Sequence, residues 1–259
     1  MPPVKLFQFR HSPFCEKARL LLSAKAVPYA VQEVTPGVGQ VDLFRRSGQR
    51  QVPVLQDGDV LAVGSVAIAR HLDSKVPEPP LLPVDPQARA RALLWENWAD
   101  TTLAHGARMA LLQAVSQDNH LRKALLPQAT PTPLRDLLGA LPGEMVSGVS
   151  QLLTRAGFQQ LGHALEQLTT LVANGQPLLD AQHCVADVAV AAQLYGLKFP
   201  TAAGAELAGR GVPGIADHPL FEPLFAWRDR IYGAMGRGDL TPAPSSDPDN
   251  PASTPGDHG

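Results

Sequence analysis

A run of prolines divides this chain into two parts with different hydrophobic patterns. Five prolines fall between residues 77 and 86, and such a density can neither continue a helix nor lie inside a sheet. Strand-like and helix-like segments alternate before it, and only helical periodicities follow it. The chain has 259 residues, enough for two compact units. We therefore expect an α/β domain at residues 1–76, a linker at 77–87 and an all-helical domain at 88–235.

The first part predicts the element order βαβαββα. Alternating or β-rich runs predict strands at Val4–Phe9, Tyr29–Val34, Val52–Gln56 and Val60–Val63. The last two strands are joined by Asp57-Gly58, a strong hairpin signal. Apolar residues at helical spacing predict three helices: one after Ser12-Pro13, a weak one at Val41–Arg46, and one after Ser65. We expect Ser65 to cap the third helix.

The second part predicts a helical bundle, because its apolar residues recur every three or four positions. The stripes are Leu94, Trp98, Thr101, His105, Met109 and Leu112, then Met145 to Val172, Val185 to Leu197 and Leu220 to Met235. Residues 127–143 contain four prolines and predict a loop. From Gly236 onward almost nothing apolar remains, so residues 236–259 predict a disordered tail.

Composition excludes several classes of function. The formal net charge is -2, so no basic surplus indicates a nucleic acid partner. Charged residues and prolines interrupt every apolar stretch before it reaches the length of a membrane span. The two cysteines, Cys15 and Cys184, lie in no CxxC or Cys/His cluster, so neither a disulfide framework nor a metal site is expected. No secretory signal is evident, and we expect a cytoplasmic protein.

The segment Arg10 to Arg19, with the sequence RHSPFCEKAR, places a serine where a strand turns into a helix. A helix N-terminus carries unpaired N–H groups and a partial positive charge, which stabilise a thiolate. An adjacent hydroxyl can donate one more hydrogen bond, and Ser12 occupies that position. The alternative is a purely structural Ser-Pro helix start. Both interpretations of Ser12 stay open at this point.

These residues resemble the active-site turn of glutathione S-transferases that use serine or cysteine. Two further blocks agree: Gln51 to Leu55 resembles the family's cis-proline strand, and Gly64 to Ile68 resembles its acidic-Ser-x-Ala-Ile block. The similarity covers about residues 4–235. It implies a thioredoxin-like N-terminal domain followed by an all-α C-terminal domain, assembled as a homodimer.

The resemblance also implies roles for individual residues. Ser12 would activate the sulfur of bound glutathione, and Arg10 would be a second catalytic group. The residues that would bind glutathione are Ser12, Gln51, Val52, Pro53, Gly64 and Ser65, with the peptide bond before Pro53 in the cis form. Trp98, Thr102 and His105 would line the pocket for the second substrate, although core packing explains Trp98 equally well.

Four positions depart from the family pattern or allow other interpretations. The family carries an acidic residue or glutamine where this chain has Gly64. Cys15 has no partner cysteine at position 12, which favours a structural role. Cys184 replaces a hydroxyl residue in a Ser/Thr-x-x-Asp capping box that ends at Asp187. Asp100 would lie on a solvated helix face or reach a neighbouring subunit's site.

We therefore expect a glutathione S-transferase that conjugates the glutathione thiol to a small apolar electrophile. The first alternative is a non-catalytic binding or scaffold protein with the same fold, which Gly64 and Cys184 favour. The second is a glutathione-dependent reductase, isomerase or dehalogenase, which would share the chemistry of the first domain.

Overall fold

The computed structural model describes residues 3–35, 38–126, 130, 133, 155–179 and 182–237, and it confirms the order βαβαββα. The strands are β1 (Val4–Gln8), β2 (Tyr29–Glu33), β3 (Val54–Asp57) and β4 (Val60–Val63). The helices among them are α1 (Pro13–Ala24), α2 (Val38–Ser47) and α3 (Ser65–Lys75). The sheet has the order β2-β1-β3-β4, in which only the β1–β2 pair is parallel.

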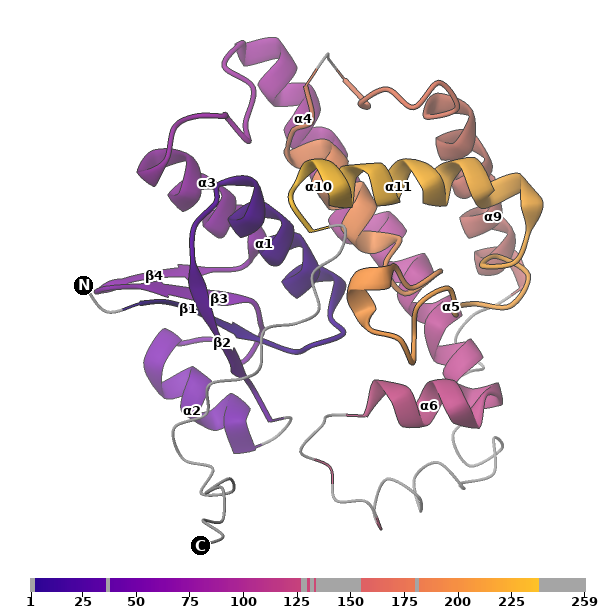
Figure 1. Ribbon diagram of the computed structural model, residues 1–259, viewed down its shortest axis with the longest axis horizontal. Coiled ribbons are helices and arrows are strands. Elements are labelled where there is room, and N and C mark those ends of the chain that lie inside the picture. The colour runs from indigo at the N-terminus through magenta and orange to yellow at the C-terminus, as the bar shows by residue number, and fades with distance from the viewer. Residues whose placement is uncertain are drawn as a thin grey trace, which may run out of the picture.

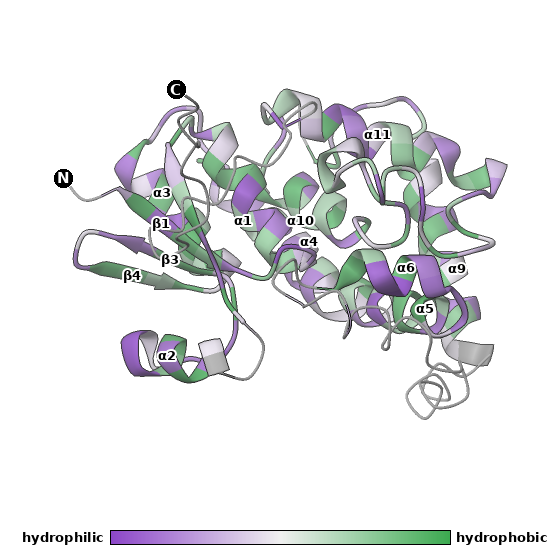
Figure 2. Ribbon diagram, turned by 60° about the horizontal axis from the view of Figure 1, so that its bottom comes forward, coloured by the Kyte–Doolittle hydropathy of each residue, from purple (hydrophilic) through white to green (hydrophobic). Residues whose placement is uncertain are grey.

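Helices cover both faces of this sheet. Helices α1 and α3 lie on one face and α2 on the other (Figures 1 and 2). The alternation of β1 explains the two layers, because successive side chains of a strand point to opposite faces. Leu6 belongs to the large core beneath α1 and α3, whereas Phe7 packs in a small separate cluster with Leu43 of α2.

The described residues after the proline run contain helices and one isolated bridge between Lys198 and Gly211. A helical path runs from Pro86 to Gln117 and comprises α4 (Pro86–Trp98), a π-helical turn η1 (Ala99–Leu103) and α5 (Ala104–Gln117). It is followed by α6 (Asn119–Leu125), α9 (Arg155–Leu171), α10 (Val185–Gln193) and α11 (Glu222–Ala234), with short 3₁₀ turns η3 (Thr201–Ala203) and η4 (Pro219–Phe221). None of the described helices has the length and apolar content needed to cross a membrane. The predicted loop at 127–143 lies almost entirely outside the described residues.

The long helical path is confirmed, but the face we expected it to bury is wrong. Leu94, in the predicted stripe, is 70% exposed. The buried face is instead rich in alanine: Ala88, Ala92, Glu96, Ala99, Leu103, Ala107, Ala110 and Ala114. Small side chains let α4 and η1 pack closely against α10, a helix whose residues are all buried. The prediction followed the large apolar residues of the helix, whereas the buried face consists mainly of small residues that allow close helix packing.

The linker, predicted at residues 77–87, ends at residue 85 in the structure, because the last of its prolines is already helical. Helix α4 begins at Pro86, a first helical position that tolerates proline. The Asp85 side chain caps it by accepting a hydrogen bond of 2.8 Å from the backbone N–H of Ala88. The connection before it is anchored at both ends: Lys25 donates to the carbonyl of Val76 at 2.6 Å, and Asp73 accepts from Leu81 N–H at 2.8 Å.

A buried ion network joins the two halves of the chain. Lys17 of α1 is fully buried, and its Nζ lies 2.6 Å from Glu96 Oε1 of α4. The same Nζ lies 2.7 Å from Asp100 Oδ2, which shows that Asp100 is not on a solvated face. Gln193 of α10 donates to the other oxygen of Asp100 at 3.2 Å. A buried cation with two carboxylate partners thus fixes α1 against the helical bundle.

Replacing Lys17 with methionine tests how much this network contributes to the free energy of unfolding. The change leaves Glu96 and Asp100 facing each other without a cation, so we expect the free energy of unfolding to fall by about 3–5 kcal/mol. Urea unfolding at neutral pH measures it. Lys5→Met, at an exposed position of β1, is the matched control and should change stability little. A loss below about 1 kcal/mol for Lys17→Met would show that the network is not stabilising.

Candidate functional site

The strand register brings the three sequence blocks of the resemblance to one edge of the sheet. Phe7 near the end of β1 pairs with Val54 at the start of β3, and Val54 pairs with Val63 at the end of β4. One residue further, the N–H of Gly64 donates to the carbonyl of Pro53 at 2.9 Å. The turn that follows β1, the proline that precedes β3 and the start of α3 therefore meet at the same end of the sheet.

Ser12 occupies the N-cap position of α1, but its side chain does not cap the helix. Pro13 is the first helical residue, and the backbone N–H of Ser12 donates to Phe9 at 3.1 Å. The hydroxyl makes no capping hydrogen bond. A Ser-Pro pair retained only to start a helix would use that hydroxyl on a backbone N–H. The Ser12 hydroxyl instead hydrogen-bonds the thiol of Cys15, so it lies at the positive end of the helix without engaging a backbone N–H.

Cys15, one turn into α1, is fully buried. Burial raises the pKa of its thiol to about 11, although Arg19 and a hydrogen bond from Ser12 act in the opposite direction. The thiol is therefore protonated at neutral pH, and a protonated thiol is a poor nucleophile. The geometry supports the structural interpretation of this cysteine.

The peptide groups of Arg10, two residues before Ser12, are held from both sides. Its N–H donates to Glu33 Oε2 at 3.1 Å, and its carbonyl accepts from Arg19 Nη2 at 2.8 Å. Gln8 also donates to Glu33, at 2.6 Å. Side chains of α1, β1 and β2 thus fix the backbone of the turn, which is the kind of support that a precise binding site needs.

The same cluster continues to the C-terminal end of the described chain. Glu16 of α1 accepts from Arg19 Nε at 2.6 Å and from Arg237 Nε at 2.6 Å. Burial opposes ionisation of Glu16, but the attraction of Arg19 and Arg237 outweighs it and holds the pKa of this carboxyl below its ordinary value. The prediction that a disordered tail begins at Gly236 is therefore wrong for Arg237, which is buried. The rest of that predicted tail lies outside the described residues.

His11 is held beside the turn by aromatic residues of the helical part. Its Nδ1 lies 3.1 Å from the hydroxyl of Tyr195, and its ring stacks on Tyr195 and meets Phe199 edge-on. Burial, reinforced by the neighbouring charges of Arg10 and Arg19, lowers the pKa of His11 to about 4. The imidazole is therefore neutral at physiological pH.

The blocks around Pro53 and Ser65 agree with the prediction in part. The Val52–Pro53 peptide bond is cis, as the resemblance implied, and Gln51 is exposed just before it. The N-cap of α3 is Gly64 rather than Ser65. Gly64 adopts a φ of 83°, which glycine reaches without strain, so the cap moves one residue towards the N-terminus. Ser65 becomes the first helical residue and is buried.

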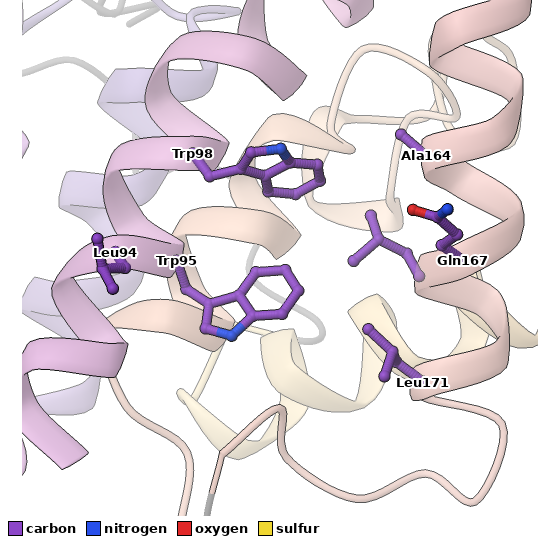
Figure 3. Close-up of a pocket in the computed structure, with 7 residues that line it drawn as sticks. Leu94, Trp95, Trp98, Ala164, Gln167 and Leu171 are labelled. Atoms are coloured by element: carbon purple, nitrogen blue, oxygen red, sulfur yellow. The ribbon is translucent and has the colours of Figure 1, made fainter. Parts of the chain in front are cut away.

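Trp98, predicted to line the second-substrate pocket, faces a groove between α4 and α9. Trp95 and Trp98 point across it towards Ala164 and Gln167 (Figure 3). The groove has a volume of about 340 Å³ and an apolar lining, and Arg10 and His11 do not line it. Thr102 and His105, the other two predicted pocket residues, are exposed on η1 and α5. The structure does not place Thr102 or His105 in that groove.

The capping box of α10 is present despite its cysteine. Asp187 is fully buried and accepts a hydrogen bond of 2.9 Å from the backbone N–H of Cys184. Its other carboxylate oxygen accepts from the N–H of Leu178 at 2.8 Å. Asp187 therefore fixes the start of the central helix. Among the described residues, no group of three or more His, Cys, Asp and Glu side chains is arranged to hold a metal ion.

Sequence reasoning missed the buried charges of α1. In the sequence, the helix after Ser12 has an apolar face, so its charged residues are expected on a polar face in contact with water. The charged residues are Glu16, Lys17 and Arg19, and the apolar ones are Phe14, Ala18, Leu21 and Leu22. The structure buries every residue from 15 to 22. No signal within α1 separates a solvated charge from a paired one, and Arg237 lies more than 200 positions away, in a polar segment.

Comparison with known proteins agrees with this geometry. Residues 6–80 match the family model for the "Glutathione S-transferase, N-terminal domain". A stringent starvation protein A homolog from Pasteurella multocida is 35% identical over 89 residues, which are 34% of this chain and 42% of that protein. Glutathione S-transferase Z2 from Arabidopsis thaliana is 37% identical over 90 residues, which are 34% of this chain and 40% of that protein.

The likeness in structure extends further than the likeness in sequence. A theta class glutathione S-transferase from Xanthomonas axonopodis pv. citri, solved with glutathione bound, superposes with a TM-score of 0.59 at 23% identity. This superposition covers 93% of this chain and 99% of that one. The sequence match, by contrast, spans less than half the length of the two curated relatives. Residues 6–80 therefore match the N-terminal domain of glutathione S-transferases, and the chain as a whole has the fold of these proteins.

The ion pairs of Glu16 predict a specific response to acid. A carboxyl whose pKa is lowered by folding stabilises the protein at pH values above its unfolded pKa, here 4.5. That contribution is lost as the pH falls through the lower pKa of the folded state. Glu16→Gln should lower the free energy of unfolding at pH 7 by about 3 kcal/mol. It should also flatten the decline in stability below about pH 4.5.

Urea unfolding at steps of pH measures both effects. Glu78→Gln, at an exposed carboxylate of the connection before α4, is the matched control and should keep the wild-type slope. An unchanged acid slope in Glu16→Gln would mean that the pKa of Glu16 is not lowered by folding.

Proposed function

We propose that this protein is a glutathione S-transferase in which Ser12 activates the glutathione thiol for attack on a small electrophile. The observation that carries the proposal is the Ser12 hydroxyl, which stands at the N-terminus of α1 without capping it. The match of residues 6–80 to the glutathione S-transferase N-terminal domain supports the choice of thiol, and a protein of similar fold has been solved with glutathione bound. The protein would act as a cytoplasmic homodimer.

In this mechanism the protein lowers the pKa of the bound thiol and holds two reactants together. The N–H groups at the start of α1 and the Ser12 hydroxyl stabilise the thiolate. The thiol proton passes to solvent, and the thiolate forms a C–S bond to the electrophilic carbon as the carbon–halogen bond of an aryl halide breaks and halide leaves. No covalent bond to the enzyme forms. Arg10, which lies two residues before Ser12, adds positive charge to the same turn.

The glutathione backbone would bind along the edge of the sheet. The backbone of Val52, before the cis bond to Pro53, pairs with the cysteinyl part of glutathione. Ser65, at the start of α3, offers its hydroxyl and N–H to the γ-glutamyl carboxylate. Gly64 supplies no carboxylate for the γ-glutamyl amine, and exposed Gln51 reaches the glycyl end. We therefore expect recognition to depend on Ser65 more than on its neighbour.

A second candidate is a protein of the same fold that binds ligands or partners without catalysis. Two observations favour it: the missing side chain at Gly64, and the similarity over 89 residues to a protein named stringent starvation protein A homolog. A glutathione-dependent reductase, isomerase or dehalogenase would share the thiol site with the transferase and differ in the second substrate.

Ser12→Ala distinguishes the transferase from both a capping role and a binding protein. We expect kcat with a general aryl halide electrophile to fall by about 10²-fold, the usual cost of removing one donor to a developing anion. The dissociation constant for glutathione should change less than about threefold, because the hydroxyl acts on the thiolate. Steady-state kinetics and calorimetry measure the two quantities.

The control for this substitution is Ser74→Ala, at an exposed serine of α3 that should leave both quantities unchanged. Equal losses of turnover and glutathione affinity in Ser12→Ala would indicate a structural role for the serine. Wild-type protein that binds glutathione but turns over no electrophile would favour the binding protein.

Ser65→Ala tests the placement of glutathione itself. Removing the hydroxyl should weaken glutathione binding by about 1–3 kcal/mol, the cost of losing a charge-assisted partner. Titration calorimetry of the wild type and the variant measures the difference, and thermal unfolding of each checks that α3 is intact. Absence of glutathione binding by the wild type would leave the fold unaffected and rule out the glutathione assignment.

A further inference from the structure

A cavity of about 240 Å³ opens beside residues 10–12, the turn where the proposed function places the thiol and which we call the thiol turn. It is separate from the groove lined by Trp95 and Trp98, the tryptophan groove. Arg10 and His11 form its wall on the side of the turn. The opposite wall comes from the C-terminal end of α6 with the residue after it, and from the end of η3 with the segment that follows. Its residues are Ala124, Leu126, Ala203, Gly204, Ala205, Glu206 and Leu207. The two cavities share no lining residue.

The guanidinium of Arg10 is the unusual group in this cavity. Throughout the described part of the chain, no side chain forms an ion pair or hydrogen bond with it; only the backbone of Arg10 is bonded. The guanidinium reaches across the cavity, because a Cβ built on Gly204 would lie 3.9 Å from its Nη2. The other arginines of this region, Arg19 and Arg237, are both paired with Glu16. A half-buried cation without a partner favours an anionic ligand.

His11 adds a hydrogen-bond donor to the same wall. The hydroxyl of Tyr195 is buried, and burial raises its pKa, so it stays protonated and can donate to His11 Nδ1. We assign the imidazole proton to Nε2 on the basis of this hydrogen bond. The ring therefore presents one N–H donor and no charge. Glu206 is the acidic residue of the lining, and it is exposed at the rim.

We propose that this cavity binds the second substrate and that Arg10 and His11 select electrophiles that carry a carboxylate. The aliphatic side chains of the opposite wall would contact a small apolar body, and the guanidinium would pair with the carboxylate. The inference rests on the proposed function, because it places the electrophile next to the thiol at Ser12. It moves the second-substrate site from Trp98, Thr102 and His105 to the other side of the thiol turn.

The selectivity is measured with two glutathione conjugates that differ in one group. S-(4-carboxybenzyl)glutathione carries the carboxylate, and S-(4-carbamoylbenzyl)glutathione is its neutral analogue of nearly the same shape. Calorimetric titration of the wild type should show the carboxylate conjugate binding roughly tenfold more tightly, as a charge-assisted pair predicts. In Arg10→Gln the ratio of the two dissociation constants should fall to about one.

Two further variants sharpen the comparison. Arg10→Lys keeps the charge without the planar fork and should retain part of the preference. Arg91→Gln makes the same change of charge at an exposed position of α4 and should retain all of it. Because both conjugates contain glutathione, the ratio cancels any effect of these substitutions on the thiol site.

The outcomes separate the two proposals. Equal affinities in the wild type, or a preference that survives Arg10→Gln, would overturn the inference and leave the transferase in place. Equal weakening of both conjugates by Arg10→Gln, with the preference unchanged, would assign Arg10 to a carboxylate of glutathione itself and would also overturn it. Failure of both conjugates to bind the wild type would remove the glutathione site and the inference with it.

Discussion

The burial of helix α1 on every side is the constraint on which the rest of the structure depends. Helices α10 and α3 pack against α1, Lys17 pairs with Glu96 of α4, and the sheet lies on the remaining side (Figure 2). Its charged residues therefore have no route to water, and a buried charge persists only with a partner. Lys17 takes its partners from η1 and α4, and Glu16 takes one from Arg237 near the other end of the chain. Distant segments are thereby joined at one helix.

This arrangement also explains why the thiol turn is well defined. Loops at functional sites need support from neighbouring elements to hold catalytic geometry. Here Arg19 connects the ion pair of Glu16 to the carbonyl of Arg10, and Glu33 holds the N–H of the same residue. The buried charges of α1 therefore act on the backbone that presents Ser12. Stability and site geometry share the same side chains.

The two cavities beside the helical domain differ in chemistry and in place. The tryptophan groove is apolar and lies between α4 and α9 (Figure 3). The cavity at Arg10 and His11 carries a charge and a hydrogen-bond donor next to the thiol turn. A reaction between a thiolate and an electrophile needs both reactants within contact distance. Under the proposed function, the smaller, more polar cavity would meet that condition, because Arg10 and His11 of the turn form part of its wall.

Local signals in the sequence predicted the element order of the first domain, and the family resemblance implied the cis bond at Pro53. The meeting of the three blocks at one sheet edge comes from the strand register, which those signals do not specify. Three further features follow from the folded arrangement alone: the buried face of the long helix, the cap at Gly64 and the role of Arg237. These depend on which surfaces approach closely and which charges meet across the chain. A periodicity records residue types along one helix, whereas burial and pairing are set by neighbours that are distant in sequence.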